Sequence, residues 1–351
     1  MTISSPLRRH RGPVGTGEAQ PIPAAPAVVR KKPRVLVLAD TPGWAWSRKA
    51  QAYARYLADD FDVTVAYYAA VPPFAEFDLL HLMEFPQLRL VIEQGGHRAG
   101  GQMIAGPLGV GKVSWPFKVV SGGTAHVWPT WGVAQMRMWA RMCDAWHANS
   151  RLLETELRQF HPHVYYTPNG VDTEFWAPGP VRAGPLVAVH VGKPNPRKGA
   201  HLIVEAARRA GIELKMIQRT SRFAYSAEHM REFYRAADIA ITASNMDGTP
   251  NPMIEAAACG LALVSTPIGN MPELMIPGRG ARGFLLSPTF SYFEAPEERD
   301  FVQRDGIVLR DTVAPGPRGI YGQWTGPVVE LLTSALAEAL AWMIGHPEDA
   351  R

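Results

Sequence analysis

The chain has 351 residues, of which 46% are hydrophobic and 19% are charged, as is typical of a soluble protein with about two domains. Its net charge is +4, but seven basic residues and one acidic residue lie among the first 34, so this segment carries +6 and the remainder −2. This distribution argues against a folded basic surface for stable nucleic-acid binding. Two distant cysteines, Cys143 and Cys259, exclude a disulfide framework and favour a reducing compartment.

Residues 1–33 are predicted to form a disordered basic tail, because they are rich in Pro, Ala and Gly and lack an apolar run. A weaker alternative is an electrostatic tether to a membrane or a nucleic acid. The start does not resemble a signal peptide, and no segment offers about 18 uninterrupted apolar residues. We therefore expect a cytoplasmic protein whose only membrane contact would be peripheral.

Short apolar runs alternate with helical patterns through residues 34–177, which predicts an N-terminal domain with a parallel, doubly wound sheet. The predicted helices begin near residue 50 and cover 131–142 and 151–160. The predicted strands cover 34–39, 63–68, 79–83, 119–121, 145–148 and 164–167.

A segment rich in Pro and Gly, residues 177–185, indicates a domain boundary, and the alternation restarts after it. The C-terminal domain, 178–351, contains an insert at about 288–326 with no clear periodicity. Its predicted helices begin near residues 200 and 251 and cover 227–237 and 328–343. Its predicted strands cover 186–191, 214–217, 239–243, 262–265 and 283–286. Two such α/β domains predict a ligand cleft between the carboxyl ends of the two sheets.

The segment from Asp247 to Gly260 predicts a helix that begins at the carboxyl end of a strand, with Asn251 as its N-cap and Pro252 next. Free backbone N–H groups at such a helix start attract a phosphate. The carboxylates of Asp247 and Glu255 beside it favour a ligand rich in hydroxyl groups. A plain strand, loop and helix with solvated acids remains the alternative.

The same segment resembles the acidic-x7-acidic signature of retaining, nucleotide-sugar-dependent glycosyltransferases of family four, which have the GT-B fold of two facing Rossmann-like domains. The resemblance implies that Asp247 contacts hydroxyl groups of the donor sugar and that Glu255 holds the ribose. It further implies that the intervening loop follows the diphosphate and sugar. The loop residues are Gly248, Thr249, Pro250 and Asn251. Asp247 stands where the family usually has Glu.

Three further segments extend the resemblance. Lys193 and Lys198 occupy the positions of two cations that grip the donor diphosphate in the family. Asn169 and Gly170 belong to a Pro-Asn-Gly-Val-Asp stretch, which is expected to shape the cleft between the domains. His126 follows the fourth strand, where the family often has a histidine near the sugar. Asp247, His126 and Lys198 are therefore the candidate catalytic residues.

The resemblance implies transfer of a sugar from a nucleotide-diphosphate sugar to an acceptor hydroxyl, with retention of configuration. Fixed cations and a helix start face the leaving diphosphate, and no cluster has metal-ligand spacing, so neither a metal nor a cofactor is expected. The acceptor stays open among saccharide, lipid, small molecule and modified DNA. Two other functions stay open: a sugar-nucleotide epimerase on the same fold, and an inactive sugar-nucleotide-binding module.

Overall fold

The structure is a computed structural model, and the fold described below is that of the compact unit Pro33–Arg351. Of the predicted tail, only residues 31–33 fall within the described part of the chain. The described residues are 31–43, 45–95, 98–99, 102–103, 118–123, 128–194, 196–218, 225–244, 247–276, 280, 282–286, 301–304, 307–310 and 327–351.

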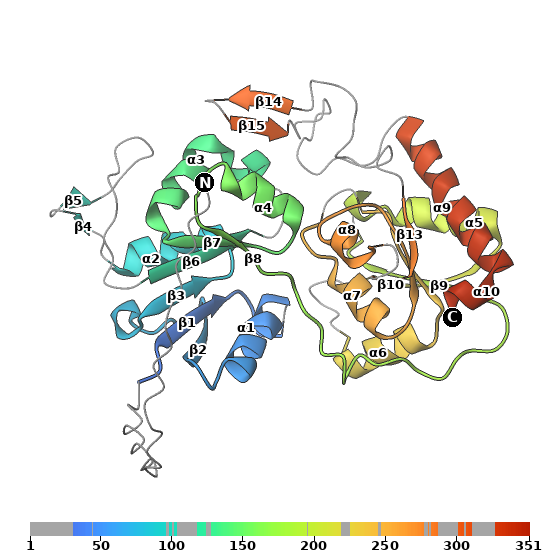
Figure 1. Ribbon diagram of the computed structural model, residues 1–351, viewed down its shortest axis with the longest axis horizontal. Helices are drawn as coiled ribbons and strands as arrows, with labels where there is room; N and C mark the ends of the chain where they lie inside the picture. The colour runs from blue at the N-terminus through green and yellow to red at the C-terminus, as the bar shows by residue number, and fades with distance from the viewer. Residues whose placement is uncertain are drawn as a thin grey trace, which may run out of the picture. The chain divides into compact units, whose positions relative to one another are not determined.

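The first half of this unit is built on a six-stranded parallel sheet with strand order β2-β1-β3-β6-β7-β8 (Figure 1). Its strands are β1 (Arg34–Ala39), β2 (Asp62–Tyr67), β3 (Leu79–Leu82), β6 (Lys118–Gly123), β7 (Ala145–Ala148) and β8 (Val164–Tyr166). Its helices are α1 (Ala45–Tyr56), α2 (Leu88–Gly95), α3 (Trp128–Met142) and α4 (Arg151–Arg158), with 3-10 turns η1 (Phe74–Glu76) and η2 (Phe85–Gln87) and the short pair β4 (Arg98–Ala99) and β5 (Gln102–Met103).

Strand β1 is buried on both faces, as its continuous apolar run predicts. Leu36 and Leu38 pack into a core with residues of α3 and α4. Val35 and Val37 point to the other face, where Ala50 of α1 packs against them. This alternation holds α1 against the sheet, so the side chains on its remaining faces are available to the second half of the unit.

The second half is built on a five-stranded parallel sheet with strand order β10-β9-β11-β12-β13. Its strands are β9 (Val187–Gly192), β10 (Glu213–Gln218), β11 (Ile239–Thr242), β12 (Ala262–Ser265) and β13 (Gly283–Leu285). Its helices are α5 (Ala200–Ala210), α6 (Ala227–Arg235), α7 (Asn251–Ala258), α8 (Met271–Leu274), α9 (Pro327–Gly345) and α10 (Pro347–Ala350), with the 3-10 turn η3 (Pro196–Lys198).

Strand β9 shows the same two-sided burial. Ala188 packs into a core with α5 and α9, and Val187 and Val189 pack into a second core with α6 and α7. In this sheet the strand order reverses between β9 and β11. The loops that follow these two neighbouring strands therefore leave from the crevice where α/β sheets tend to bind ligands.

The doubly wound parallel sheets predicted from the sequence are confirmed, and each predicted strand and helix has a counterpart within a few residues. Within the insert at about 288–326, the structure contains an antiparallel pair of strands, β14 (Phe301–Arg304) and β15 (Ile307–Arg310). The sequence did not predict this pair, because the insert shows no clear periodicity. Each strand has only four residues, too few for a recognisable pattern. Among the described residues, no helix is long and apolar enough to cross a membrane.

Candidate donor site in the second half

The sheet topology brings the predicted lysine and the predicted acid into contact. Lys198 ends η3 after β9, Asp247 follows β11, and β9 and β11 are neighbours. Nζ of Lys198 donates a hydrogen bond to Oδ2 of Asp247, and both side chains are partly buried. Oδ1 of the same carboxylate accepts from the backbone N–H of Gly248 at 3.1 Å. A cation and an anion thus lie together at the switch point of the sheet.

Two glycines allow the turns at this point to approach each other closely. Gly199 has φ +65°, and a Cβ there would lie 2.3 Å from the carbonyl oxygen of Ala243. Gly269 has φ +52°, and its Cβ would lie 2.3 Å from the carbonyl oxygen of Gly248. Any other residue would combine a left-handed backbone with a backbone clash. The loop that carries Asp247 is therefore backed by main chain on two sides.

His190 of β9 lies beneath this turn and is almost fully buried. Its Nδ1 pairs with the carbonyl oxygen of Ile241 at 2.9 Å, which makes Nδ1 the protonated nitrogen of a neutral ring. Burial lowers the pKa of His190, and the nearby charge of Lys198 adds to this effect. His190 is therefore a neutral support for the turn rather than a third cation.

The start of α7 differs from the prediction in one respect. Asn251 was expected to cap the helix, but α7 begins at Asn251 itself, Pro250 occupies the cap position, and no side chain caps the helix start. The physical reason is a competing partner: Oδ1 of Asn251 accepts from Nδ2 of Asn169 at 3.0 Å. The predicted Pro at the first turn and the break near Gly260 are both present.

Glu255 lies one turn into α7 and is buried. The hydroxyl of Tyr234, on α6, donates to its Oε2 at 3.0 Å. Nη1 of Arg48, on α1 of the first half, lies 3.7 Å from its Oε1. The carboxylate is thus oriented by its own half of the unit and neutralised by the other half.

Contacts between the two halves

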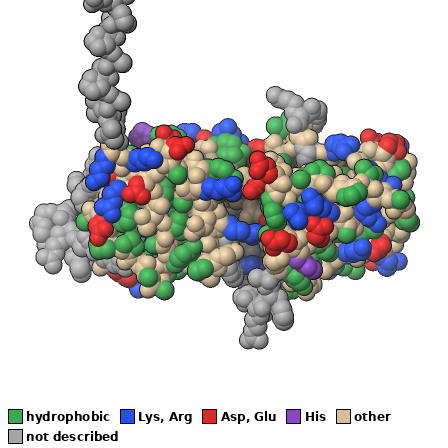
Figure 2. Space-filling view, turned by 90° about the horizontal axis from the view of Figure 1, so that it is seen from below, with side chains coloured by type: hydrophobic (Ala, Val, Ile, Leu, Met, Phe, Trp, Pro, Cys, Tyr) green, Lys and Arg blue, Asp and Glu red, His purple; other side chains and the backbone are tan. Residues whose placement is uncertain are grey.

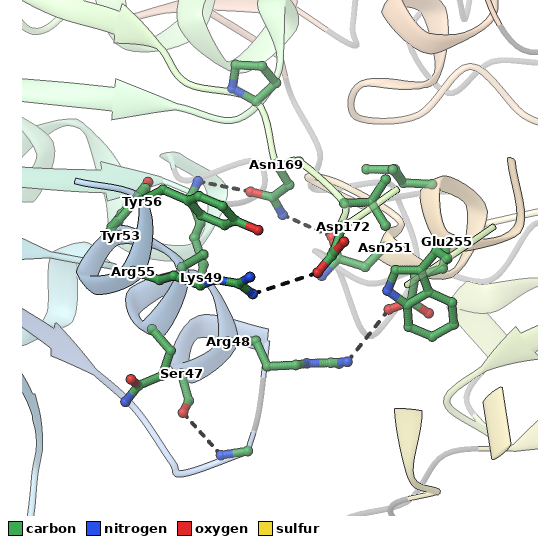
Figure 3. Close-up of a pocket in the computed structure, with 18 of the residues that line it drawn as sticks. Ser47, Arg48, Lys49, Tyr53, Arg55, Tyr56, Asn169, Asp172, Asn251 and Glu255 are labelled. Carbon is green, nitrogen blue, oxygen red and sulfur yellow. Dashed lines mark hydrogen bonds and ion pairs between the residues drawn. The ribbon is translucent and has the colours of Figure 1, made fainter. Parts of the chain in front are cut away.

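A cavity of about 810 Å³ separates α1 from α7 and from the segment that leaves the first sheet. Arg48, Lys49 and Arg55 of α1 face Asp172 and Glu255 across it (Figure 3). Acidic and basic side chains also border a hollow in the surface seen from below (Figure 2). Tyr53, Tyr56, Trp176 and Ile254 supply aromatic and apolar surface to the cavity. This mixture can hold a polar ligand that also has a flat or apolar part.

Lys49 connects the two halves through Asn169. Its Nζ donates to Oδ1 of Asn169 at 2.9 Å and lies 3.4 Å from the carbonyl oxygen of Thr167. Asn169 in turn donates to Asn251, as described above. Burial lowers the pKa of Lys49 to about 8, so the ammonium form predominates at pH 7.

Two histidines, His81, which is half-buried, and His147, which is buried, lie behind Lys49 at the carboxyl ends of strands in the first sheet. Nε2 of His81, on β3, lies 3.1 Å from Nε2 of His147, on β7, and Nδ1 of His147 lies 3.3 Å from Oγ1 of Thr167. Burial, helped by the charge of Lys49, lowers the pKa of His81 to about 3. Burial lowers the pKa of His147 well below its ordinary value, and the charge of Lys49 adds to this. Both rings are therefore neutral at pH 7.

Two further contacts join the halves at loops of the candidate site. Oε1 of Glu273, on α8, accepts the backbone N–H of Arg151 at the start of α4, at 2.5 Å. Oγ1 of Thr249 lies 3.5 Å from the carbonyl oxygen of Asn149, close to the outer limit for a hydrogen bond. A carboxylate at a helix N-terminus is favourably placed, so Glu273 is a stabilising contact from the second half to the first.

Most of the residues predicted for the site come together. Lys198, Asp247, Gly248, Thr249, Pro250, Asn251 and Glu255 lie along the β11–α7 connection or against it, and Asn169 and Gly170 face α7 across the cavity. Lys193 follows β9 and is exposed. His126 lies outside the described residues, so its predicted position near the sugar stays a prediction.

Sequence reasoning missed Arg48, Lys49, Tyr234 and Glu273. Arg48 and Lys49 are adjacent cations on the helix that follows the first strand, but solvated lysines and arginines are common on such helices. Their roles depend on contacts with residues more than a hundred positions away. Among the described residues, no group of three or more His, Cys, Asp or Glu is arranged to hold a metal ion.

Residues 185–292 match the family described as "Glycosyl transferases group 1", which confirms in this part of the chain the resemblance seen in the sequence. No curated protein matches the chain. Among solved structures, sucrose-phosphate synthase (tll1590) from Thermosynechococcus elongatus is similar, with a TM-score of 0.52 and 13% identity over 90% of this chain and 98% of that one. This likeness shows the fold, and the GT-B architecture predicted from the sequence is confirmed.

The pneumococcal O-GlcNAc transferase GtfA, solved in complex with UDP and GlcNAc, has a TM-score of 0.47 and 12% identity to this chain. The match covers 77% of this chain and 51% of that one, so the chain spans about half the length of the GtfA structure.

Proposed function

We propose that the protein is a retaining glycosyltransferase that moves a sugar from a nucleotide-diphosphate sugar to an acceptor hydroxyl. One observation carries the proposal: Lys198 and Asp247 meet at the switch point of the second sheet, just before the helix that carries Glu255, in the segment that matches group 1 glycosyltransferases. This segment thus supplies a cation for the diphosphate, an acid for the sugar and an acid for the ribose.

In the proposed reaction, the bond between the anomeric carbon and the diphosphate breaks, and the acceptor oxygen forms a new bond to that carbon on the same face of the sugar. The acceptor proton leaves with the diphosphate. Lys198, Lys193 and the backbone N–H groups at the start of α7 would stabilise the charge that develops on the leaving group. A fixed cation gains in effect as this charge grows, so it acts mainly on the transition state.

The Lys198–Asp247 ion pair has a consequence for donor binding. In the proposed complex, the diphosphate takes the ammonium group and the sugar hydroxyl groups donate to the carboxylate. Donor binding would therefore exchange one ion pair for two ligand contacts, and a nucleoside diphosphate without sugar would satisfy only the lysine. We expect the sugar to contribute to affinity because it restores a partner to Asp247.

The experiment is a thermal-shift screen of nucleoside diphosphates and nucleotide sugars, since a ligand that binds only the folded state raises its melting temperature. Any donor that binds is then incubated without acceptor, and the products are followed by NMR. Slow release of nucleoside diphosphate, with the free sugar first appearing in the donor's anomeric configuration, supports a retaining transferase with water as a substitute acceptor.

Two other results would replace the proposal. Conversion of the donor to an isomeric nucleotide sugar would make the protein an epimerase. Tight binding without turnover, both alone and across saccharide, lipid, small-molecule and DNA acceptors, would make it a sugar-nucleotide-binding module. Release of the sugar in the anomeric configuration opposite to the donor's would exclude the retaining mechanism. The proposal of sugar transfer would then still stand.

A further inference from the structure

Three side chains form a hydrogen-bonded chain from α1 of the first half to α7 of the second (Figure 3). Nζ of Lys49 donates to Oδ1 of Asn169, and Nδ2 of Asn169 donates to Oδ1 of Asn251. The distances are 2.9 and 3.0 Å, which are ordinary for strong N–H···O bonds. Asn251 is the first residue of α7, directly after the loop in which the proposed donor diphosphate would lie.

The chain has a fixed direction because a lysine ammonium group can only donate. Lys49 therefore requires the oxygen of the Asn169 amide on its side, which turns the N–H groups of Asn169 toward Asn251. Asn251 must then present its oxygen to Asn169. Its Nδ2 group, with two N–H donors, is left facing away from that partner, and no hydrogen bond joins Nδ2 to the other described residues.

The orientation of the Asn251 amide matters at this position. The opposite orientation would place a carbonyl oxygen, which only accepts, where the amide nitrogen now stands. Beside a helix start whose backbone N–H groups favour an anion, an amide N–H adds a donor to a diphosphate, whereas an amide oxygen would repel it. Asparagine alone does not select between these orientations, since the two ends of its amide have nearly the same shape.

The position of Lys49 is unfavourable for stability alone. Its side chain is largely covered, and an ammonium group taken from water loses hydration that two hydrogen bonds and the nearby ring of Tyr53, 5.8 Å away, replace only in part. His81 and His147 lie behind it as neutral rings and offer no compensating negative charge. A neutral side chain of similar length would fill this space at lower cost.

We propose that Lys49 is a positioning residue for the donor site: through Asn169, it turns the amide of Asn251 so that its N–H groups, rather than its oxygen, meet the diphosphate. The inference rests on the proposed function, because it requires a diphosphate at the start of α7. It assigns to the first half of the protein a part in donor binding that is exerted through two asparagines and without contact with the donor.

A double-mutant cycle tests the relay. The probe is whichever of ADP, CDP, GDP, TDP and UDP binds the wild-type protein most tightly, measured by titration calorimetry. Lys49→Gln can accept as well as donate, so it no longer fixes the direction, and Asn169→Ala removes the link. Each should weaken binding by about tenfold or more, the usual effect of losing a hydrogen bond to a charged group. The double variant should bind the nucleoside diphosphate no more weakly than the single variant that binds it less tightly.

The cycle separates a relay from a direct effect of charge. If Lys49 acts through space, Lys49→Gln weakens binding equally whether residue 169 is Asn or Ala, and the two losses multiply. Arg89→Gln is the control, because it removes one positive charge from an exposed position on α2 of the same half, outside the cavity lining. It should change the dissociation constant by less than about twofold, the size expected for a screened surface charge.

A second variant guards against simple unfolding. Asn169→Asp keeps an acceptor for Lys49, so the melting temperature should be maintained, but it cannot donate to Asn251 and should weaken the nucleoside diphosphate at least as much as Asn169→Ala does. Multiplied losses in the cycle, or wild-type affinity in Asn169→Asp, would overturn the inference while the proposed function stood. A wild-type protein that binds none of the five diphosphates would overturn both.

Discussion

Arg48, on the first helix of the N-terminal half, lies 3.7 Å from Glu255 in the C-terminal half. The acid expected to hold the nucleotide ribose therefore has a cation partner from across the cavity before any ligand is present. A ribose would have to share the carboxylate with Arg48 or displace it. Arg48 is half-exposed and Glu255 is buried, so the arginine is the partner that can move.

The two acids should differ in the ligands they affect. Glu255→Gln removes the charge that the ribose would meet, so it should weaken a nucleoside diphosphate and its nucleotide sugar by similar factors. Asp247→Asn should weaken the nucleotide sugar and leave the diphosphate unchanged or tighter, because Lys198 loses its ion-pair partner. Calorimetric titration of both ligands against both variants measures the difference. Equal losses in all four titrations would contradict this division of roles.

Lys198 should matter more for turnover than for binding. A donor that stabilises developing charge in a water-poor site typically contributes about 10²–10³-fold to turnover. Lys198→Ala should therefore lower kcat by about this factor and raise the donor dissociation constant much less. Initial rates and titrations on one preparation give both numbers. A loss confined to affinity would assign Lys198 to ground-state binding only.

Lys193 offers a matched substitution for the same proposal. It is exposed after β9 and stands where the related family has arginine. Lys193→Arg should retain activity within about threefold, since arginine supplies the same charge with a fork suited to phosphate. Lys193→Met should weaken the donor. If the arginine variant is as impaired as the methionine variant, charge at this position is not what the donor requires.

Chelation tests the proposed absence of a metal from the reaction. If lysines and the start of α7 stabilise the diphosphate, EDTA should leave the initial rate of wild-type protein within about twofold. Lys198→Ala should be no more sensitive to EDTA than wild type. Loss of activity with EDTA that magnesium or manganese restores would show that a metal takes part, whatever the fate of the transferase proposal.

The paired histidines predict a specific acid sensitivity. Both imidazole rings are neutral in the folded state, whereas their pKa in the unfolded chain is near 6.5. Below about pH 6.5 the unfolded chain therefore binds more protons than the folded protein does. Stability should fall as the pH decreases from about 6.5 toward the folded pKa of His81, about 3. In this window, each histidine can lower the free energy of unfolding by up to about 1.4 kcal/mol for each pH unit of acidification.

Thermal melts between pH 7.5 and 5 measure this slope. His81→Gln should give a shallower decrease in melting temperature than wild type, even if its stability at pH 7.5 is lower. His201→Gln is the control, because His201 is exposed on α5. An unchanged slope in His81→Gln would show that other groups cause the acid sensitivity.

The sequence was sufficient to predict the sheets and to place the candidate residues of the second half at strand ends and a helix start, because both depend on local patterns. Lys198, Asp247 and Glu255 lie at fixed distances from strand ends and helix starts, and the strand order then brings them together. The contribution of the first half depends on tertiary contacts that leave no local pattern. Lys49 meets Asn169 from 120 positions away, and Asn251 gives its side chain to Asn169 instead of capping its own helix.

Gly199 and Gly269 back the candidate donor loop with peptide groups instead of side chains. Main chain has no alternative rotamers, so this wall of the site has one shape, and variation among neighbouring side chains cannot easily remodel it. A change in sugar preference would then have to come from the opposite wall, where α1 and the segment around Asn169 supply side chains that can be exchanged. Engineering of donor choice in this protein should therefore begin in the half that does not carry the donor motif.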